Sequence, residues 1–124
     1  MFANFKIYPV LAAVDIERAR RWYADKLGLQ PTKDIQGELL YELHGSSFLL
    51  YPTSAAGTAQ NTVAAWDVDN LEAVMSELRE RGVVFEEYDA PDFKTVNGIA
   101  DFGQARGAWF KDSEGNILAL NQWV

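Results

Sequence analysis

Few side chains in this sequence of 124 residues are suited to acid–base or nucleophilic chemistry, and they lie far apart. The chain has no cysteine and one histidine, His44. Thiolate catalysis, a disulfide framework, cysteine-bound metals and any mechanism that needs two imidazoles are therefore excluded. Asp67 is the strongest acid–base candidate, because a carboxylate set among apolar side chains is suited to proton transfer. Tyr51 and His44 are weaker candidates for the same role.

Each of these residues also has an ordinary structural interpretation. Asp67 lies near the end of an expected strand, where it is solvated or supports the start of the following helix. His44 precedes a glycine turn and fits a surface position. No strained nucleophile turn and no glycine-rich phosphate loop occurs in the sequence.

A second group of residues is suited to binding a flat organic molecule instead of transforming it. Tyr51 and Asn121 occupy equivalent places in the two halves of the chain, from which both could offer hydrogen bonds to a ligand. Aromatic side chains that could stack on a flat ligand are Trp109, Phe110, Phe93 and Phe102. The pattern does not decide whether Trp109 or Phe110 faces the site, and one of the two is expected in the core.

The elements that position these residues repeat. Residues 7–19 and 62–73 both predict an apolar strand, an acidic cap and the start of an amphipathic helix. The helix N-caps are expected at Asp15 and at Asp69 or Asn70, and Gly28 and Gly82 are expected to end the helices.

Short strands follow each helix. We expect them at 36–44 and 47–51 in the first half and at 83–88, 107–111 and 116–122 in the second. Each half then has the order βαβββ. The predicted fold is α+β, a single domain of two modules at about 1–53 and 61–124, joined by a linker at 54–60. A longer loop, 89–104, interrupts the second half only.

The ordered set of these segments resembles the vicinal oxygen chelate superfamily, which includes glyoxalase I, extradiol dioxygenases and bleomycin-resistance proteins. The segments that carry the resemblance cover nearly the whole chain and are 14–19, 22–23, 27–29, 68–73, 81–83 and 109–117. The resemblance implies paired βαβββ modules whose mixed sheets curl into a cleft, with the helices on the outer face. It also implies that the cleft is often completed in a dimer.

Enzymes of this superfamily hold a divalent metal through His or Glu on the first and last strands of each module. The resemblance places those positions at Pro9, Leu49, Val63 and Ala119. None of these side chains can bind a metal. The residues on either side of them in the sequence include no His, Asp or Glu. We therefore expect no metal and no other cofactor, which disfavours glyoxalase I and extradiol dioxygenase activity.

Three functions remain open. The first is metal-independent binding of a small hydrophobic or aromatic molecule in the cleft between the modules, as in bleomycin-resistance proteins. The second is a metal-free isomerase or lyase that uses Asp67, Tyr51 or His44 for proton transfer. The third is a dimeric interaction module whose cleft is closed.

Charge and hydropathy limit the kinds of partner that the protein can have. A net charge of −7 and a pI near 4.6 argue against nucleic acid and anionic membranes. No apolar run is long enough to span a bilayer, and the first residues lack the pattern of a signal peptide. We expect a cytoplasmic protein that binds a small organic molecule. We also expect a homodimer, because half-sheets leave edges and apolar surface to cover.

Overall fold

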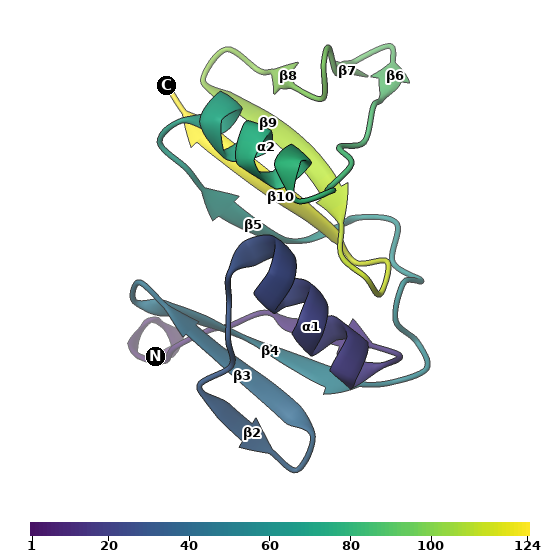
Figure 1. The fold of residues 1–124 in the computed structure, drawn as a ribbon. Helices are drawn as coiled ribbons and strands as arrows, with labels where there is room; N and C mark the ends of the chain where they lie inside the picture. The colour runs from purple at the N-terminus through teal and green to yellow at the C-terminus, as the bar shows by residue number, and fades with distance from the viewer.

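The computed structural model describes residues 1–124 as two similar modules, each a four-stranded sheet with one helix (Figure 1). Module 1 contains β1 (Val10–Ala13), α1 (Ile16–Leu27), β2 (Lys33–Ile35), β3 (Glu38–Leu43) and β4 (Ser46–Pro52). A short 3₁₀ helix, η1 (Phe2–Asn4), precedes it. Module 2 contains β5 (Thr62–Asp67), α2 (Leu71–Glu80), β8 (Ala100–Asp101), β9 (Ala105–Lys111) and β10 (Ile117–Trp123). A ribbon of β6 (Asp89–Ala90) and β7 (Phe93–Lys94) is inserted before β8.

Both helices begin at the capping residues that the sequence indicates. The Asp15 carboxylate accepts from the backbone N–H of Arg18 at 3.0 Å, and Gly28 ends α1 in the left-handed conformation. In α2 the cap is Asn70, not Asp69, and its side chain accepts from the N–H of Ala73 at 3.1 Å. Such caps satisfy donors that have no partner inside the helix. Neither helix is long and apolar enough to cross a membrane.

The two sheets have the same topology. Their strand orders are β1-β4-β3-β2 and β5-β10-β9-β8. In each module the strand that comes first in the sequence pairs in parallel with the strand that comes last, β1 with β4 and β5 with β10. The remaining pairs are antiparallel. This arrangement confirms the predicted α+β fold of two βαβββ modules.

The prediction of a strand at residues 83–88 is wrong. That segment touches the sheet only through a single bridge between Phe85 and Phe110 and a hydrogen bond from the N–H of Glu86 to the Trp109 carbonyl. The Glu87 carboxylate then accepts from the N–H of Gly98 at 2.6 Å and from the Thr95 hydroxyl at 2.8 Å. These side-chain bonds compete with sheet pairing, and β8 becomes the outer strand instead.

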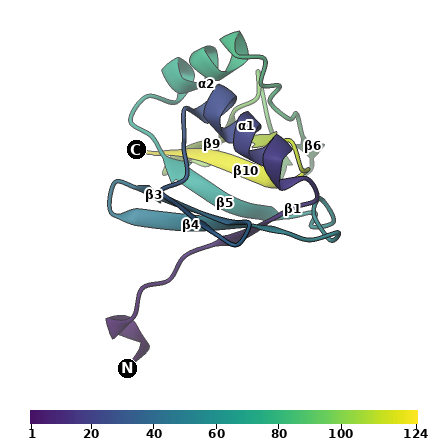
Figure 2. The ribbon, with the colours of Figure 1, turned by 60° about the horizontal axis from the view of Figure 1, so that its bottom comes forward.

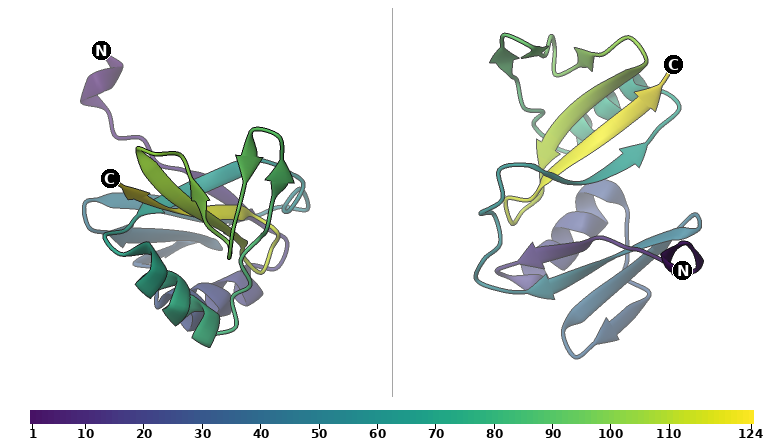
Figure 3. Two further views of the ribbon diagram at one scale, coloured as in Figure 1. Left: turned by 90° about the horizontal axis from the view of Figure 1, so that it is seen from above. Right: turned by 180° about the vertical axis from the view of Figure 1, so that it is seen from behind.

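The helices lie on one side of the sheets, as the edge-on view in Figure 2 shows. The buried core fills the space between helices and sheets, and its largest fully buried side chains include Tyr23, Tyr41, Phe110 and Leu118. On the opposite side, which we call the open face, the β6–β7 ribbon lies at the edge of module 2, and no helix covers either sheet (Figures 2 and 3).

A buried polar network joins the two modules. The turn between β9 and β10 carries Asp112, Glu114 and Asn116, which are all buried although polar. Arg18 of α1 donates two hydrogen bonds to the Glu114 carboxylate at 2.9 and 3.0 Å. The Asn116 side chain donates to the Ala12 carbonyl at 2.8 Å. These bonds, of which the Arg18–Glu114 pair is charge-assisted, set the position of one module against the other.

Candidate functional site

Four aromatic side chains gather on the open face of module 2. They form what we call the aromatic cluster: Tyr88, Phe93, Phe102 and Trp109. The ring centroids of Phe93 and Trp109 lie 5.0 Å apart, and those of Tyr88 and Phe93 lie 5.2 Å apart. Phe93 and Phe102 are stacked at 5.8 Å with an interplanar angle of 25°. Phe102 is 54% exposed, so part of the cluster is available to a ligand.

Local structure explains how distant residues meet in this cluster. Trp109 projects from β9 on the open face, and its indole N–H donates to the Thr62 hydroxyl of β5 at 3.2 Å. The N–H of Tyr88 donates to the Thr95 hydroxyl at 2.8 Å, and the N–H of Thr95 donates to the Tyr88 carbonyl at 2.9 Å. These bonds hold the segments on either side of the β6–β7 ribbon together and place Phe93 over Trp109.

The structure therefore brings together Trp109, Phe93 and Phe102, three of the residues proposed from the sequence to stack on a ligand. Sequence reasoning missed Tyr88. Burial raises the pKa of the Tyr88 hydroxyl, and the nearby Glu86 carboxylate raises it further. The available signal was a tyrosine directly before a loop that already carried two phenylalanines.

Phe110, the fourth aromatic residue proposed to stack on a ligand, lies away from the aromatic cluster. It is fully buried on the helix side of β9. It stacks with Trp22 at 6.3 Å and meets Phe85 edge-on at 5.6 Å. Neighbouring residues of a strand point to opposite faces, so placing Trp109 on the open face sends Phe110 into the core.

Two polar side chains accompany the aromatic cluster on the open face. Asn121 of β10 lies opposite Gly107 of β9 and next to Asp67 of β5 in the sheet register. The indole N–H of Trp123 donates to the Asp67 carboxylate at 3.2 Å. An amide and a carboxylate beside aromatic rings can orient a ligand through hydrogen bonds.

The open face of module 1 has a separate hollow of about 300 Å³. It is lined by Lys6, Tyr8, Ile35, Glu38, Leu40, Glu42, Ser47 and Leu49. Tyr51 lies two residues beyond Leu49 on β4 and is half-buried. Tyr51 and the aromatic cluster are therefore on different sheets.

A metal position at Pro9 would require the odd-numbered residues of β1 to face the cleft, and the structure shows the reverse. Leu11 and Ala13 are buried in the core, and Val10 lies opposite Leu49 on the open face. The family's metal position on β1 therefore falls at Tyr8 or Val10 and not at Pro9. An all-apolar strand such as Val10–Ala13 has no polar alternation from which to read its two faces.

The residues at the family's metal positions do not fit a divalent ion. Leu49, Val63 and Ala119 offer no oxygen or nitrogen side-chain ligand, and Tyr8 or Val10 takes the place of Pro9. Glu38 and Glu42 do lie on the open face of module 1. However, no three His, Cys, Asp or Glu side chains lie together in an arrangement that could hold a metal. Divalent cations need several such ligands.

The three proton-transfer candidates stay separate. His44 is exposed at the tip of the turn between β3 and β4 with a positive φ of 42°. Tyr51 is on β4, and Asp67 ends β5. No hydrogen bond joins any two of them. An acid–base site usually has a base within hydrogen-bonding distance of its partner. These three residues form no such pair.

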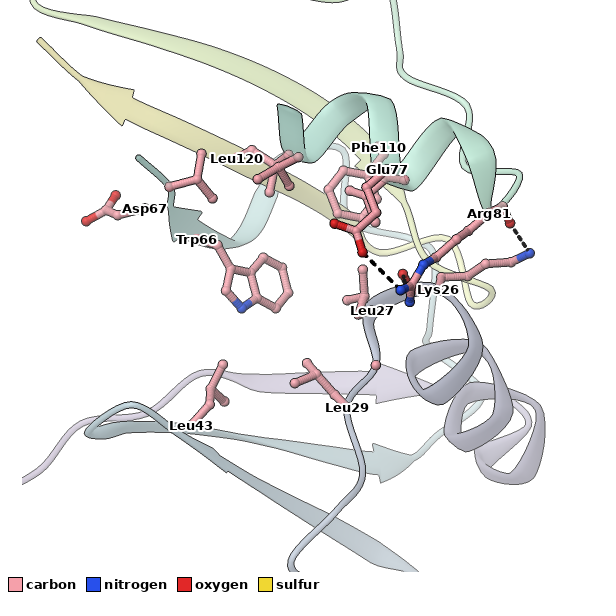
Figure 4. Close-up of a pocket in the computed structure, with 14 residues that line it drawn as sticks. Lys26, Leu27, Leu29, Leu43, Trp66, Asp67, Glu77, Arg81, Phe110 and Leu120 are labelled. Atoms are coloured by element: carbon pink, nitrogen blue, oxygen red, sulfur yellow. Dashed lines mark hydrogen bonds and ion pairs between the residues drawn. The ribbon is translucent and has the colours of Figure 1, made fainter. Parts of the chain in front are cut away.

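A further cavity of about 320 Å³ lies between the modules on the helix side (Figure 4). Its walls are mostly apolar and include Leu27, Leu29, Leu43 and Trp66. Figure 4 shows that the Asp67 carboxylate and the Lys26 amine point away from it. Arg81 at its rim is paired with Glu77 at 3.0 Å. The polar side chains of its lining thus point away from it or, like Glu77 and Arg81, are bonded to each other.

Fold, strand order and sequence together define the class of protein. The family model of the Glyoxalase/Bleomycin resistance protein/Dioxygenase superfamily matches residues 7–120. The chain belongs to this superfamily. No curated protein shows significant sequence similarity to the chain.

Solved structures with the same fold include proteins that are named for antibiotic binding or resistance. A glyoxalase/bleomycin resistance protein from Catenulispora acidiphila is similar over 98% of this chain and 100% of its own, with a TM-score of 0.68 and 23% identity. TnmS3, an antibiotic-binding protein from a Streptomyces species, matches over 98% of both chains, with a TM-score of 0.65 and 21% identity. The fosfomycin resistance protein FosX from Listeria monocytogenes matches over 98% of this chain and 94% of its own, with a TM-score of 0.70 and 12% identity.

Proposed function

We propose that the protein binds a flat, mostly apolar organic molecule against the aromatic cluster and does so without a metal ion. The observation that carries this proposal is the gathering of Tyr88, Phe93, Phe102 and Trp109 on a sheet face that no helix covers. Asn121 and Asp67 supply hydrogen-bonding groups beside it. Aromatic pairs contribute about 0.5–1.5 kcal/mol each beyond the area that they bury, so a ring stacked on Phe102 would gain useful affinity.

The named relatives support a binding role. TnmS3 is an antibiotic-binding protein, and others are described as resistance proteins. A protein that sequesters a toxic molecule needs affinity for the ground state and no stabilisation of a transition state. A face without metal ligands and without a base–partner pair meets that requirement.

The proposal includes a homodimer. The aromatic cluster and the 300 Å³ hollow lie on the open faces of different modules. A ligand on one face stays exposed on its other side. Two copies related by a twofold axis would place the module 1 face of one copy opposite the module 2 face of the other, which would enclose the ligand between them.

The alternative functions receive less support. A metal-free isomerase or lyase needs an acid–base residue next to the substrate. Tyr51 and His44 lie in module 1, away from the aromatic cluster, and the Asp67 carboxylate has no acid–base partner, since the one hydrogen bond that it accepts comes from the Trp123 indole. A closed interaction module would need the open face to be filled, whereas Phe102 is 54% exposed.

The test is a fluorescence titration with aminoacridine and hydroxyanthraquinone, two flat probes of different charge. We expect saturable tryptophan quenching by at least one probe, and a loss of affinity of about tenfold, equivalent to about 1.4 kcal/mol, in Phe102→Ala. Val84→Ala, which shortens another exposed apolar side chain, is the matched control and should bind normally. Absence of binding by both probes would contradict the proposal.

Metal independence is tested in the same assay. We expect affinity to be unchanged by EDTA and by added zinc, nickel, iron or manganese. Elemental analysis of the purified protein should find no stoichiometric transition metal. A bound metal whose removal abolishes probe binding would overturn this part of the proposal.

A further inference from the structure

The cavity of about 320 Å³ on the helix side of the molecule (Figure 4) is not used by the proposed function. Module 1 contributes the end of α1, the turn that follows it and the end of β3 to its walls. Module 2 contributes the end of β5 and the face of α2. The cavity is therefore a product of the way in which the two modules are joined, and neither module encloses it alone.

Most of the apolar side chains around this cavity are only half-buried. Six of them pack against the core on one side and border the cavity on the other: Leu27, Leu29, Leu43, Trp66, Val68 and Val74. Their remaining apolar surface leaves water only when something fills the space between them. An apolar occupant would gain free energy by burying that surface, and an aromatic one would gain more by contact with the Trp66 indole.

Bonds between the C-terminal ends of the two helices fix the width of the cavity. The Lys26 amine at the end of α1 donates to the Arg81 carbonyl just beyond α2. In return, the Arg81 guanidinium donates to the carbonyls of Lys26 and Asp25 at 3.4 and 3.5 Å. The helix dipole favours cations at these helix ends. The cavity is therefore formed without an occupant, as is usual for sites that bind small molecules.

The bonds of the charged lining residues determine which charge an occupant can carry. Lys26 and Arg81 are bonded to helix carbonyls, and Arg81 is also paired with Glu77 at 3.0 Å. The remaining charged group, the Asp67 carboxylate, accepts from Trp123 and points away from the cavity. No charged side chain of the lining is left to pair with an ion inside. Because an unpaired charge is costly to bury, the cavity favours a neutral molecule.

We infer that this cavity is a second binding site, for a neutral, apolar molecule of one or two rings. An apolar cavity of about 150 Å³ is large enough to hold benzene, and this one has about twice that volume. The site is separate from the aromatic cluster, because the two lie on opposite faces of the same sheet. Phe110 lines the cavity, whereas its neighbour Trp109 belongs to the cluster. The inference therefore does not depend on the proposed function.

An NMR titration of the ¹⁵N-enriched protein tests the site, because Trp66 lines the cavity and Trp109 belongs to the aromatic cluster. The probe is 2-naphthol, a two-ring compound that is neutral at neutral pH. We expect 2-naphthol to shift the indole signal of Trp66 saturably. The charged analogue 2-naphthoate should bind there at least tenfold more weakly. A Trp66 signal that does not shift, or a shift confined to Trp109, would overturn the inference, and equal binding of 2-naphthoate would contradict the neutral class of ligand.

Variants that fill the cavity test whether 2-naphthol occupies it. Val74→Phe adds a ring from α2, and Leu43→Phe adds one from β3 in case the first variant does not fold. We expect each to weaken 2-naphthol binding at least tenfold. Val84→Phe, at an exposed position that does not line the cavity, and Phe102→Ala should both bind 2-naphthol normally. Unchanged affinity in a folded filling variant would contradict only this inference, and flat probes that bind Phe102→Ala normally would contradict only the proposed function.

Discussion

The Tyr23 hydroxyl donates a 2.7 Å hydrogen bond to the Asp112 carboxylate, which joins α1 of module 1 to the turn between β9 and β10 of module 2. Tyr23 has no exposed surface, and Asp112 is almost completely buried. The carboxylate also accepts from the N–H groups of Glu114 and Asn116, at 2.9 Å each, and from the Asn116 amide at 2.8 Å. Burial, and then the negative charge of Asp112, raise the pKa of Tyr23 well above its ordinary value, so the tyrosine remains a donor.

Removing either partner should destabilise the junction between the modules. Tyr23→Phe leaves a buried carboxylate short of one donor and should lower the free energy of unfolding by about 1–3 kcal/mol. Asp112→Ala also leaves the donors on Glu114 and Asn116 unsatisfied, and we expect it to lower that energy by about 3 kcal/mol or more. Urea denaturation measures both. Tyr51→Phe, on the open face, is the control and should change stability by less than about 0.5 kcal/mol.

The Arg18–Glu114 pair predicts how stability depends on pH. Burial alone would raise the pKa of Glu114, but hydrogen bonds from Arg18, from the N–H of Asp15 and from Ser113 outweigh it and lower the pKa to about 2. A carboxyl whose pKa is lower in the folded state stabilises the fold above its ordinary pKa, and that contribution is lost as the pH falls from about 5 towards 2.

Glu114→Gln should remove this pH dependence. We expect the wild-type protein to lose about 2 kcal/mol of stability from this carboxyl between pH 5 and pH 2, a value reduced because Arg18 is half exposed. The variant should be less stable at pH 7 and flatter across that range. Urea titrations at several pH values measure the slope, with Glu38→Gln on the open face as the control. A variant with the wild-type slope would show that Glu114 does not carry the effect.

Much of the fold followed from local sequence signals. The capping residues Asp15 and Asn70 and the left-handed Gly28 acted through contacts a few residues long, which a sequence displays directly. The similarity of residues 7–19 and 62–73 then predicted two sheets of equal topology, because similar segments fold into similar units. The structure confirms both points.

The features that were missed depend on contacts between distant residues. The faces of β1 could not be read from four apolar residues, and β9 offered Trp109 and Phe110 equally until its register with β10 was fixed. The Tyr23–Asp112 bond joins residues that are 89 positions apart. The segment 83–88 has the composition of a strand, but the Glu87 carboxylate bonds to Gly98 and Thr95 and draws it out of the sheet. Tertiary contacts overrode local preference in each case.

Gly115 should be intolerant of a side chain for two separable reasons. Its φ of +87° strains other residues, and an added Cβ would lie 2.9 Å from the Cα of Gly57 in the segment between the modules. Gly45 has a φ of +81° but nothing within 4 Å of such a Cβ. Gly45→Ala should therefore show only the conformational penalty of about 1 kcal/mol.

Comparing the two alanine variants isolates the steric contact. Gly115→Ala should lower the free energy of unfolding by about 1–2 kcal/mol more than Gly45→Ala, because the two backbones must separate. Thermal or urea unfolding of both variants measures the difference. Equal losses would mean that the segment near Gly57 moves aside freely and does not pack on the β9–β10 turn.

Alanine substitutions of Phe110 and Phe102 should have different effects, the first on stability and the second on ligand binding. Phe110 is fully buried between Trp22 and Phe85, so Phe110→Ala leaves a cavity and should lower the free energy of unfolding by about 3–5 kcal/mol. Phe102 is 54% exposed, and Phe102→Ala should lower it by less than about 1 kcal/mol while weakening binding of the flat probes about tenfold. Urea unfolding and fluorescence titration of the same two variants give both readings. A Phe102→Ala protein that binds the probes as tightly as the wild type would show that the exposed ring of the aromatic cluster does not contact the ligand.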